Sequence, residues 1–221
     1  MKIVSFKICP LVQRVTALLA AKNIPFELEF ISLSDKPQWF LDISPNGQVP
    51  VLITERGQVL FESDAIFEYL EEAYSALQPE LSLEQKARNR AWGYLATKNY
   101  LVQCAAQRSK TKNMLIERRS KLDQAFDRIE KRLGDTPFFS GDKIGTVDVS
   151  WLVLLQRAAI IEKHSGYDFI GNRPKLKAWQ QSLMASGLAE RSVADGFEDD
   201  FISFYLSDKT YLGRASAQFA A

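Results

Sequence analysis

The N-terminal third of the chain alternates between strand-like and helix-like patterns. Residues 3–6 form a short apolar run, and apolar positions recur at helical spacing over residues 10–22. In residues 26–30, phenylalanine and leucine alternate with glutamate, which predicts a half-buried strand. A short helical turn is expected over residues 37–43. These patterns predict a β-α-β unit followed by a loop that carries one helical turn.

A hairpin and a further helix complete this region. The apolar residues 51–53 and 59–61 flank a polar turn at 55–58, which is typical of an antiparallel hairpin. An amphipathic helical pattern begins at Ser63. The β-α-β unit makes its two strands parallel, and the hairpin adds an antiparallel pair. The order β-α-β-β-β-α therefore predicts an α/β domain with a mixed four-stranded sheet.

Strand patterns end after residue 75, and the patterns in the rest of the chain predict helices. Residues 76–83 contain Pro79 and no periodic pattern, so we interpret them as a linker between a domain at 1–75 and an all-α domain at 84–221. Helices are expected at 84–110, around 122–133 with Gly134 and Pro137 just beyond, and at 147–161, 174–185 and 197–206.

The composition excludes several function classes. Among 221 residues, 46% are hydrophobic and 25% are charged, and the net charge of +1 favours neither nucleic acid nor an acidic membrane. The most apolar segment, 147–161, is too short to span a bilayer, and Lys7, Gln13 and Arg14 interrupt any signal-peptide core. Two distant cysteines and the single His164 predict no metal site. They suit a reducing compartment, so we expect a cytoplasmic protein.

Cys9 is the candidate reactive group. It is followed by Pro10 at the junction of the first strand and the first helix, and proline is favoured at a first helical position. The sulfur would then lie at a helix N-terminus, where free N–H groups and the helix dipole favour an anion. This placement predicts a depressed pKa and a reactive thiolate. The alternative is that Cys9 is a small buried apolar residue.

Four motifs in register resemble the glutathione transferase superfamily, and most specifically its cysteine-type omega class. Cys-Pro-Leu-Val-Gln-Arg at residues 9–14 is similar to the Cys-Pro-Phe-Ala-x-Arg motif of that class, with Leu11 in place of the aromatic residue. The others are Lys-Pro-Gln-Trp-Phe at 36–40, Ser-Pro-Asn-Gly-Gln-Val-Pro-Val-Leu at 44–52 and Phe-Glu-Ser at 61–63. The resemblance implies a thioredoxin-like domain followed by a helical-bundle domain.

The resemblance also implies a glutathione site. Glutathione is the cosubstrate, and Cys9 forms a mixed disulfide with it. No cysteine follows closely, so a second glutathione would release the first. Val49 would pair with the glutathione backbone beside a cis Pro50. Glu62 and Ser63 would hold the γ-glutamyl end at a helix N-terminus, and Lys36 would meet the glycine carboxylate. The alternatives are a trans proline, a Ser63 that only caps a helix, and a solvated lysine.

The helical domain should supply the pocket for the second substrate. Candidates beside Leu11 are Trp92 and Tyr100, although aromatic residues at helical spacing are usually core, and Cys104 is interpreted as core. Gly145 replaces the usual capping Ser or Thr before the central helix, and Asp148 is expected to bond back to its backbone. The resemblance further implies a homodimer.

The leading hypothesis is therefore a glutathione-dependent thiol transferase. Its reactions would be deglutathionylation, dehydroascorbate reduction or removal of glutathione from a thioether. Two alternatives remain open, namely conjugation of glutathione to electrophiles and a non-catalytic binding or assembly protein that kept the fold. The sequence does not name the second substrate.

Overall fold

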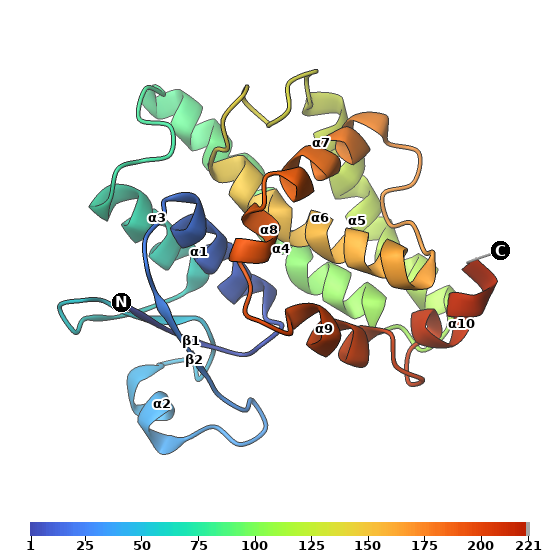
Figure 1. Ribbon diagram of the computed structural model, residues 1–221, viewed down its shortest axis with the longest axis horizontal. Coiled ribbons are helices and arrows are strands. Elements are labelled where there is room, and N and C mark those ends of the chain that lie inside the picture. The colour runs from blue at the N-terminus through green and yellow to red at the C-terminus, as the bar shows by residue number, and fades with distance from the viewer. Residues whose placement is uncertain (220–221) are drawn as a thin grey trace.

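The computed structural model describes residues 1–219, with an α/β domain followed by a helical domain (Figure 1). The short helical turn expected between the second and third strands is present, and the expected order of strands and helices is confirmed. The elements of the first domain are β1 (Lys2–Ser5), α1 (Pro10–Ala21), β2 (Glu27–Phe30), α2 (Gln38–Ile43), β3 (Val51–Ile53), β4 (Val59–Phe61) and α3 (Ser63–Ala73).

The sheet is mixed and four-stranded, as predicted. Its strand order is β2-β1-β3-β4, with β1 and β2 parallel and the other two pairs antiparallel. The central strands supply its core, since Ile3, Val4, Val51 and Leu52 are fully buried. Helices α1 and α3 cover the side of the sheet that faces the helical domain, and α2 lies on the opposite side (Figure 1). This arrangement confirms the thioredoxin-like fold.

The second domain contains seven described helices. The helix expected at 84–110 ends three residues earlier, and two short helices, α8 and α10, were not expected from the sequence. The helices are α4 (Leu83–Gln107), α5 (Lys112–Arg132), α6 (Thr146–Ser165), α7 (Pro174–Ala185), α8 (Leu188–Arg191), α9 (Phe197–Tyr205) and α10 (Tyr211–Phe219). Within the described residues, no helix combines the length and the apolar character needed to cross a membrane.

Helix α6 is the centre of the helical domain, and one buried carboxylate fixes its start. Asp148 accepts hydrogen bonds from the backbone N–H of Gly145 (2.9 Å), the backbone N–H of Phe139 (2.9 Å) and Nε1 of Trp179 (2.7 Å). The bond to Gly145 confirms the expected capping interaction. It is the one half of a capping box that is possible here, because glycine has no side chain to accept a hydrogen bond from the N–H of Asp148. Asp148 therefore joins α6 to the preceding loop and to α7.

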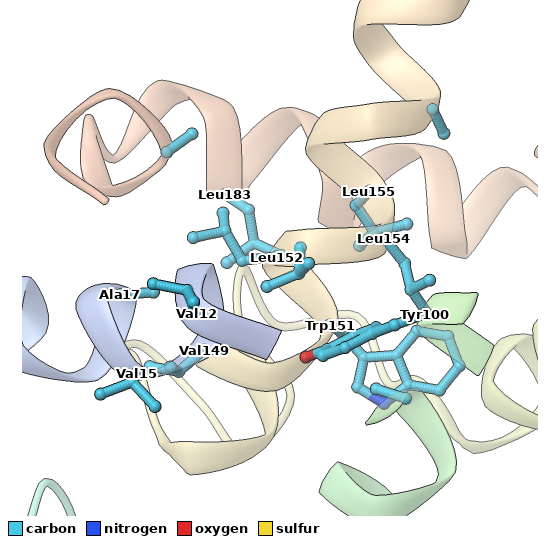
Figure 2. Close-up of a cluster of buried hydrophobic side chains, with 14 of the residues drawn as sticks. Val12, Val15, Ala17, Tyr100, Val149, Trp151, Leu152, Leu154, Leu155 and Leu183 are labelled. Atoms are coloured by element: carbon cyan, nitrogen blue, oxygen red, sulfur yellow. The ribbon is translucent and has the colours of Figure 1, made fainter. Parts of the chain in front are cut away.

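Helices α1 and α6 join the two domains through an apolar contact. Figure 2 shows Val12, Val15 and Ala17 of α1 beside Val149 and Leu152 of α6. All five side chains are almost completely buried. Burying a valine or leucine side chain contributes about 1.5–3 kcal/mol, so this contact is a substantial part of the fold's stability. Because α1 begins directly after Cys9, the contact also fixes where that residue lies.

Arg14 reinforces the same junction. It is 2% exposed and forms an ion pair with Asp64 at the start of α3, while its Nε donates to Ser150 Oγ of α6 at 3.3 Å. Its guanidinium also lies 4.1 Å from the ring centroid of Phe67. The arginine of the Cys-Pro motif therefore has a structural role, because it ties α1 to both domains.

The Asp148 contacts lead to a stability prediction. Asp148→Asn should lower the free energy of unfolding by about 1.5–3 kcal/mol, because buried N–H donors lose a charged acceptor. Urea denaturation followed by circular dichroism measures the change. Asp142→Asn, an exposed residue of the preceding turn, is the matched control and should leave stability nearly unchanged. Equal stability of the two variants would contradict this account of Asp148.

Candidate functional site

Cys9 occupies the N-cap position of α1, as expected. Its backbone is extended, with φ −71° and ψ 121°, and Pro10 is the first helical residue. The backbone N–H groups of Leu11 and Val12 belong to the first turn of α1 and lower the pKa of the Cys9 thiol, although the sulfur accepts no capping hydrogen bond. Cys9 is a free, partly buried thiol, and it lines a small cavity together with residues of β1, β2, α1 and the start of α9.

The electrostatics of Cys9 differ from the expectation. Burial raises the pKa of the Cys9 thiol above its usual value, and this effect is the largest acting on it. The N–H groups of Val12 and Leu11 and the charge of Arg157 lower the pKa but do not reverse the shift. The predicted helix N-terminus is present, but packing by the helical domain, which the sequence pattern did not show, removes much of the water that would stabilise a thiolate.

A second small cavity lies beside the Val49–Pro50 peptide bond. That bond is cis, as expected. Five of the predicted residues line the cavity, namely Leu11, Val49, Pro50, Glu62 and Ser63. Its other lining residues belong to the motifs at 44–52 and 61–63, but the sequence predicted no role for them; they are Ser44, Asn46, Gln48 and Phe61. The structure therefore gathers residues from α1, the α2–β3 loop, β4 and the start of α3 around one hollow.

Glu62 and Ser63 form the end of this cavity at α3. Glu62 is the N-cap residue and has a φ of 66°, a left-handed conformation that is unusual for a residue other than glycine. Asn46 Nδ2 donates to Glu62 Oε1 at 2.7 Å and holds the carboxylate in place. Ser63 is the first helical residue and not the cap, so its backbone N–H is one of the free donors of the helix N-terminus.

Lys36 reaches the loop that borders this cavity. Its Nζ lies beside Gly47, where an added Cβ would come within 3.6 Å of it. Gly47 has a φ of +57°, as the predicted turn requires. Lys36 does not line the cavity, but its ammonium group lies next to the loop residues Asn46 and Gln48, which do.

The two aromatic candidates for the substrate pocket lie elsewhere. Tyr100 is fully buried in the core, and its hydroxyl donates to the backbone oxygen of Ser150. Trp92 packs against Phe139 and lines a cleft next to the linker with none of the residues around Cys9. Their helical spacing reflects core packing, which is the commoner reason for such a pattern. A cavity of about 120 Å³ between α3, α4 and the linker also contains no cysteine.

Helices α4, α6 and α9 instead bring other residues close to Cys9. Arg157 donates through Nη2 to the backbone oxygen of Ile8, the neighbour of Cys9, at 3.2 Å. Its guanidinium lies 5.4 Å from the ring centroid of Phe197. Negative charge on Cys104 of α4 or Tyr205 of α9 would raise the pKa of Arg157, which burial lowers. Sequence spacing gave no signal for these residues, because they come from distant helices.

Across the described residues, His, Cys, Asp and Glu side chains nowhere form a group of three or more that could hold a metal ion. The single histidine, His164, pairs with Glu198 on the surface.

Known families match both domains in order. Residues 8–73 match the family described as "Glutathione S-transferase, N-terminal domain", and residues 64–181 match "Glutathione S-transferase, C-terminal domain". Glutathione S-transferase omega-1 of Rattus norvegicus is 30% identical over 94% of this chain and 86% of its own length. Glutathione S-transferase DHAR2 of Arabidopsis thaliana is 37% identical over 64% of this chain and 63% of its own length.

Solved structures share the whole fold. Glutathione transferase Omega 3C of Trametes versicolor superposes with a TM-score of 0.73 at 23% identity, covering 88% of this chain and 89% of its own. A rice glutathione transferase solved in complex with glutathione gives a TM-score of 0.77 at 22% identity, covering 93% and 98%. With two family domains in sequence and omega-class relatives along nearly its whole length, this chain belongs to the glutathione S-transferase family and is a glutathione transferase enzyme.

Proposed function

We propose that this enzyme is a glutathione-dependent thiol transferase in which Cys9 is the nucleophile. The observation that carries the proposal is the position of Cys9 at the N-terminus of α1, where the backbone N–H groups of Leu11 and Val12 lower the pKa of its thiol. A cysteine in this position forms a covalent bond to glutathione, whereas a hydroxyl residue would only donate a hydrogen bond. The omega-class relatives support the same reading.

The proposed chemistry is a thiol–disulfide exchange. The Cys9 thiolate attacks the glutathionyl sulfur of a glutathionylated thiol, a bond forms between Cys9 and glutathione, and the substrate sulfur leaves as a thiolate that takes a proton. A second thiolate must then attack the mixed disulfide to regenerate Cys9. The N–H groups at the start of α1 stabilise the negative charge on the Cys9 sulfur before the attack.

The cavity beside Pro50 has the groups needed to hold glutathione. The extended backbone at Val49 offers its N–H and C=O to the cysteinyl part of the tripeptide, as in strand addition. The N-terminus of α3 at Ser63, with its free N–H groups, suits the γ-glutamyl carboxylate, and the carboxylate of Glu62 suits the α-amino group. Lys36 supplies a positive charge near the loop for the glycine carboxylate.

Conjugation of glutathione to electrophiles is the second candidate, and Cys9 disfavours it as the main activity. Conjugation needs the glutathione thiolate free to attack an electrophile, and a disulfide to Cys9 consumes that thiol. Three classes of second substrate are compatible with this chemistry, namely glutathionylated thiols, dehydroascorbate and glutathione thioethers. Relatives with distinct names, including pyrimidodiazepine synthase of Drosophila melanogaster at 32% identity, favour no single one of these.

The replacement Cys9→Ser tests the nucleophile. Thiol transfer should fall to background, because a serine hydroxyl neither ionises at this site nor forms a disulfide, while glutathione binding should survive. An assay coupled to glutathione reductase, with a mixed-disulfide substrate, measures transfer, and calorimetry measures binding. Cys9→Ala is the matched control, and only the serine variant should gain conjugating activity. Retention of most of the transfer rate in Cys9→Ser would remove Cys9 from the mechanism.

The pKa of Cys9 predicts the pH dependence of its reactivity. Burial raises that pKa, so at neutral pH the thiolate fraction is smaller than that of free cysteine, and it grows as the pH rises. In the glutathione-free enzyme, the iodoacetamide alkylation rate should reach its midpoint at a higher pH than for free cysteine in the same buffer. The Cys9→Ser variant supplies the background from Cys104. A midpoint below that of free cysteine would contradict the prediction.

The replacement Ser63→Ala tests the glutathione cavity. Loss of the hydroxyl should weaken glutathione binding by about 1–2 kcal/mol, or roughly five- to thirtyfold in Kd, as for a hydrogen bond to a charged group. Titration calorimetry on the Cys9→Ser background avoids interference from disulfide formation. Ser120→Ala, at an exposed position of α5, is the control. Equal affinity of both variants would show that Ser63 takes no part in binding.

A further inference from the structure

The cleft that Trp92 lines has no role in the proposed chemistry. Its volume is about 370 Å³, which is within the range of pockets that hold small ligands. It shares no lining residue with the cavity beside Pro50 or with the cavity at Cys9. One face of α4 forms its floor through Gln85, Arg88, Asn89 and Trp92, which recur at helical spacing, while Arg132 ends α5 and Ser140 precedes α6.

Two arginine side chains in this cleft have no anionic partner. Within the described part of the chain, neither Arg88 nor Arg132 forms an ion pair, and no carboxylate lines the cleft. Glu84, one turn before Arg88 on α4, instead accepts a hydrogen bond from Ser82 Oγ at 2.8 Å. Guanidinium groups that share a cleft without a carboxylate favour an anion there, and their planar donor sets match a phosphate group.

Arg132 lies next to the aromatic wall of the cleft. Its guanidinium carbon is 4.9 Å from the ring centroid of Phe139, and that centroid is 6.1 Å from the ring of Trp92. Phe139 is 4% exposed, whereas Trp92 is only partly buried and lines the cleft. The cleft therefore has a cation beside a large aromatic ring, and such a ring provides a surface on which a flat heterocycle stacks.

Gln85 and Asn89 add one hydrogen-bond donor and one acceptor. They are one turn apart on α4, so their side chains are neighbours. Gln85 Oε1 accepts from the backbone N–H of Ser82 at 2.8 Å, which leaves its Nε2 as a donor without a partner among the residues described. Asn89 Nδ2 donates to Gln78 Oε1 at 3.4 Å, which leaves its Oδ1 as an acceptor. A donor beside an acceptor is the complement of a nucleobase edge.

We propose that this cleft is a binding site for a nucleoside monophosphate. Arg88 and Arg132 hold the phosphate, and the base stacks on Trp92. The free amide groups of Gln85 and Asn89 bind the edge of the base. The site is separate from the cavities at Cys9 and Pro50, so this inference does not rest on the proposed thiol transfer, and the two are tested independently.

Titration calorimetry of the full-length enzyme with adenosine monophosphate tests the site. The nucleotide should bind at least about tenfold more tightly than adenosine or inorganic phosphate, because each of these engages only part of the cleft. Saturating glutathione should leave its affinity unchanged, since the two cavities share no residue. Loss of nucleotide binding in the presence of glutathione would move it to the cavity beside Pro50 and overturn the inference, as would affinity no higher than that of adenosine and phosphate.

Charge-removing variants test the phosphate end of the site. Arg88→Gln and Arg132→Gln should each weaken nucleotide binding about three- to tenfold, as for charge-assisted hydrogen bonds at a solvent-exposed site. Both side chains are exposed, so both variants should fold, and circular dichroism checks this. Arg56→Gln, in the turn between β3 and β4, removes the same charge outside the cleft and is the matched control. Equal affinity of the Arg88→Gln/Arg132→Gln double variant and the control would overturn the inference.

Tryptophan fluorescence locates the base. Adenosine monophosphate should quench part of the emission of the wild type, because its base stacks on Trp92. In Trp92→Phe, which keeps an aromatic ring against Phe139, this quenching should disappear while the other tryptophans still emit. Undiminished quenching in Trp92→Phe would show that the base binds elsewhere and would overturn the inference. The rate of thiol transfer should be the same in Arg88→Gln, Arg132→Gln and the wild type, since neither arginine lines a cavity at Cys9 or Pro50.

Discussion

The packing of α1 against α6 joins the two domains and fixes the position of Cys9 between them. Val12 and Val15 of α1 are buried against Val149 and Leu152 of α6, and Arg14 adds a polar link from α1 to both domains. Cys9 lies immediately before α1, so the same contact places a residue of the α/β domain at the surface of the helical one. The surroundings of the Cys9 sulfur are therefore made by both domains together.

The same packing explains why two electrostatic effects oppose each other at Cys9. The N-terminus of α1 and the charge of Arg157 favour a thiolate, whereas the protein around the sulfur removes the water that would solvate it. Of these effects, burial prevails. In an environment of this kind, the charged form of the thiol depends on groups that the protein itself supplies.

The sequence predicted the α/β domain in detail because its signals are local. Residues 51–53 and 59–61 flank a short turn, and Pro10 directly follows Cys9 at a helix start. Asp148 was also predicted correctly, since its partner Gly145 is three residues away. The motifs that resemble known transferases located the cavity around Pro50, because four of the family positions lie within 20 residues of one another.

The sequence did not reveal contacts between distant helices. Trp92 and Tyr100 have the spacing of a pocket-lining face, but Tyr100 is buried in the core and Trp92 packs against Phe139 away from Cys9. Helical periodicity does not distinguish a core from a pocket. The predicted direction of the shift in the Cys9 pKa was wrong for the same reason. Burial of Cys9 by the second domain is a property of the assembled fold and has no local signal in the sequence. Arg157 and Tyr205 carry no local motif, and only the packing of α4, α6 and α9 brings them to the site.

Glu62 illustrates a conflict between stability and the placement of a group that faces the cavity. Its φ of 66° is a conformation that costs a residue with a side chain about 1–3 kcal/mol, and glycine would adopt it freely. A sequence optimised only for folding would have glycine here. The strained backbone instead turns the carboxylate toward Asn46 and leaves the N–H groups of α3 free at the cavity. The site is therefore a place where the chain is less stable than it could be, and stabilising it there would remove the group that gives the cavity its negative end.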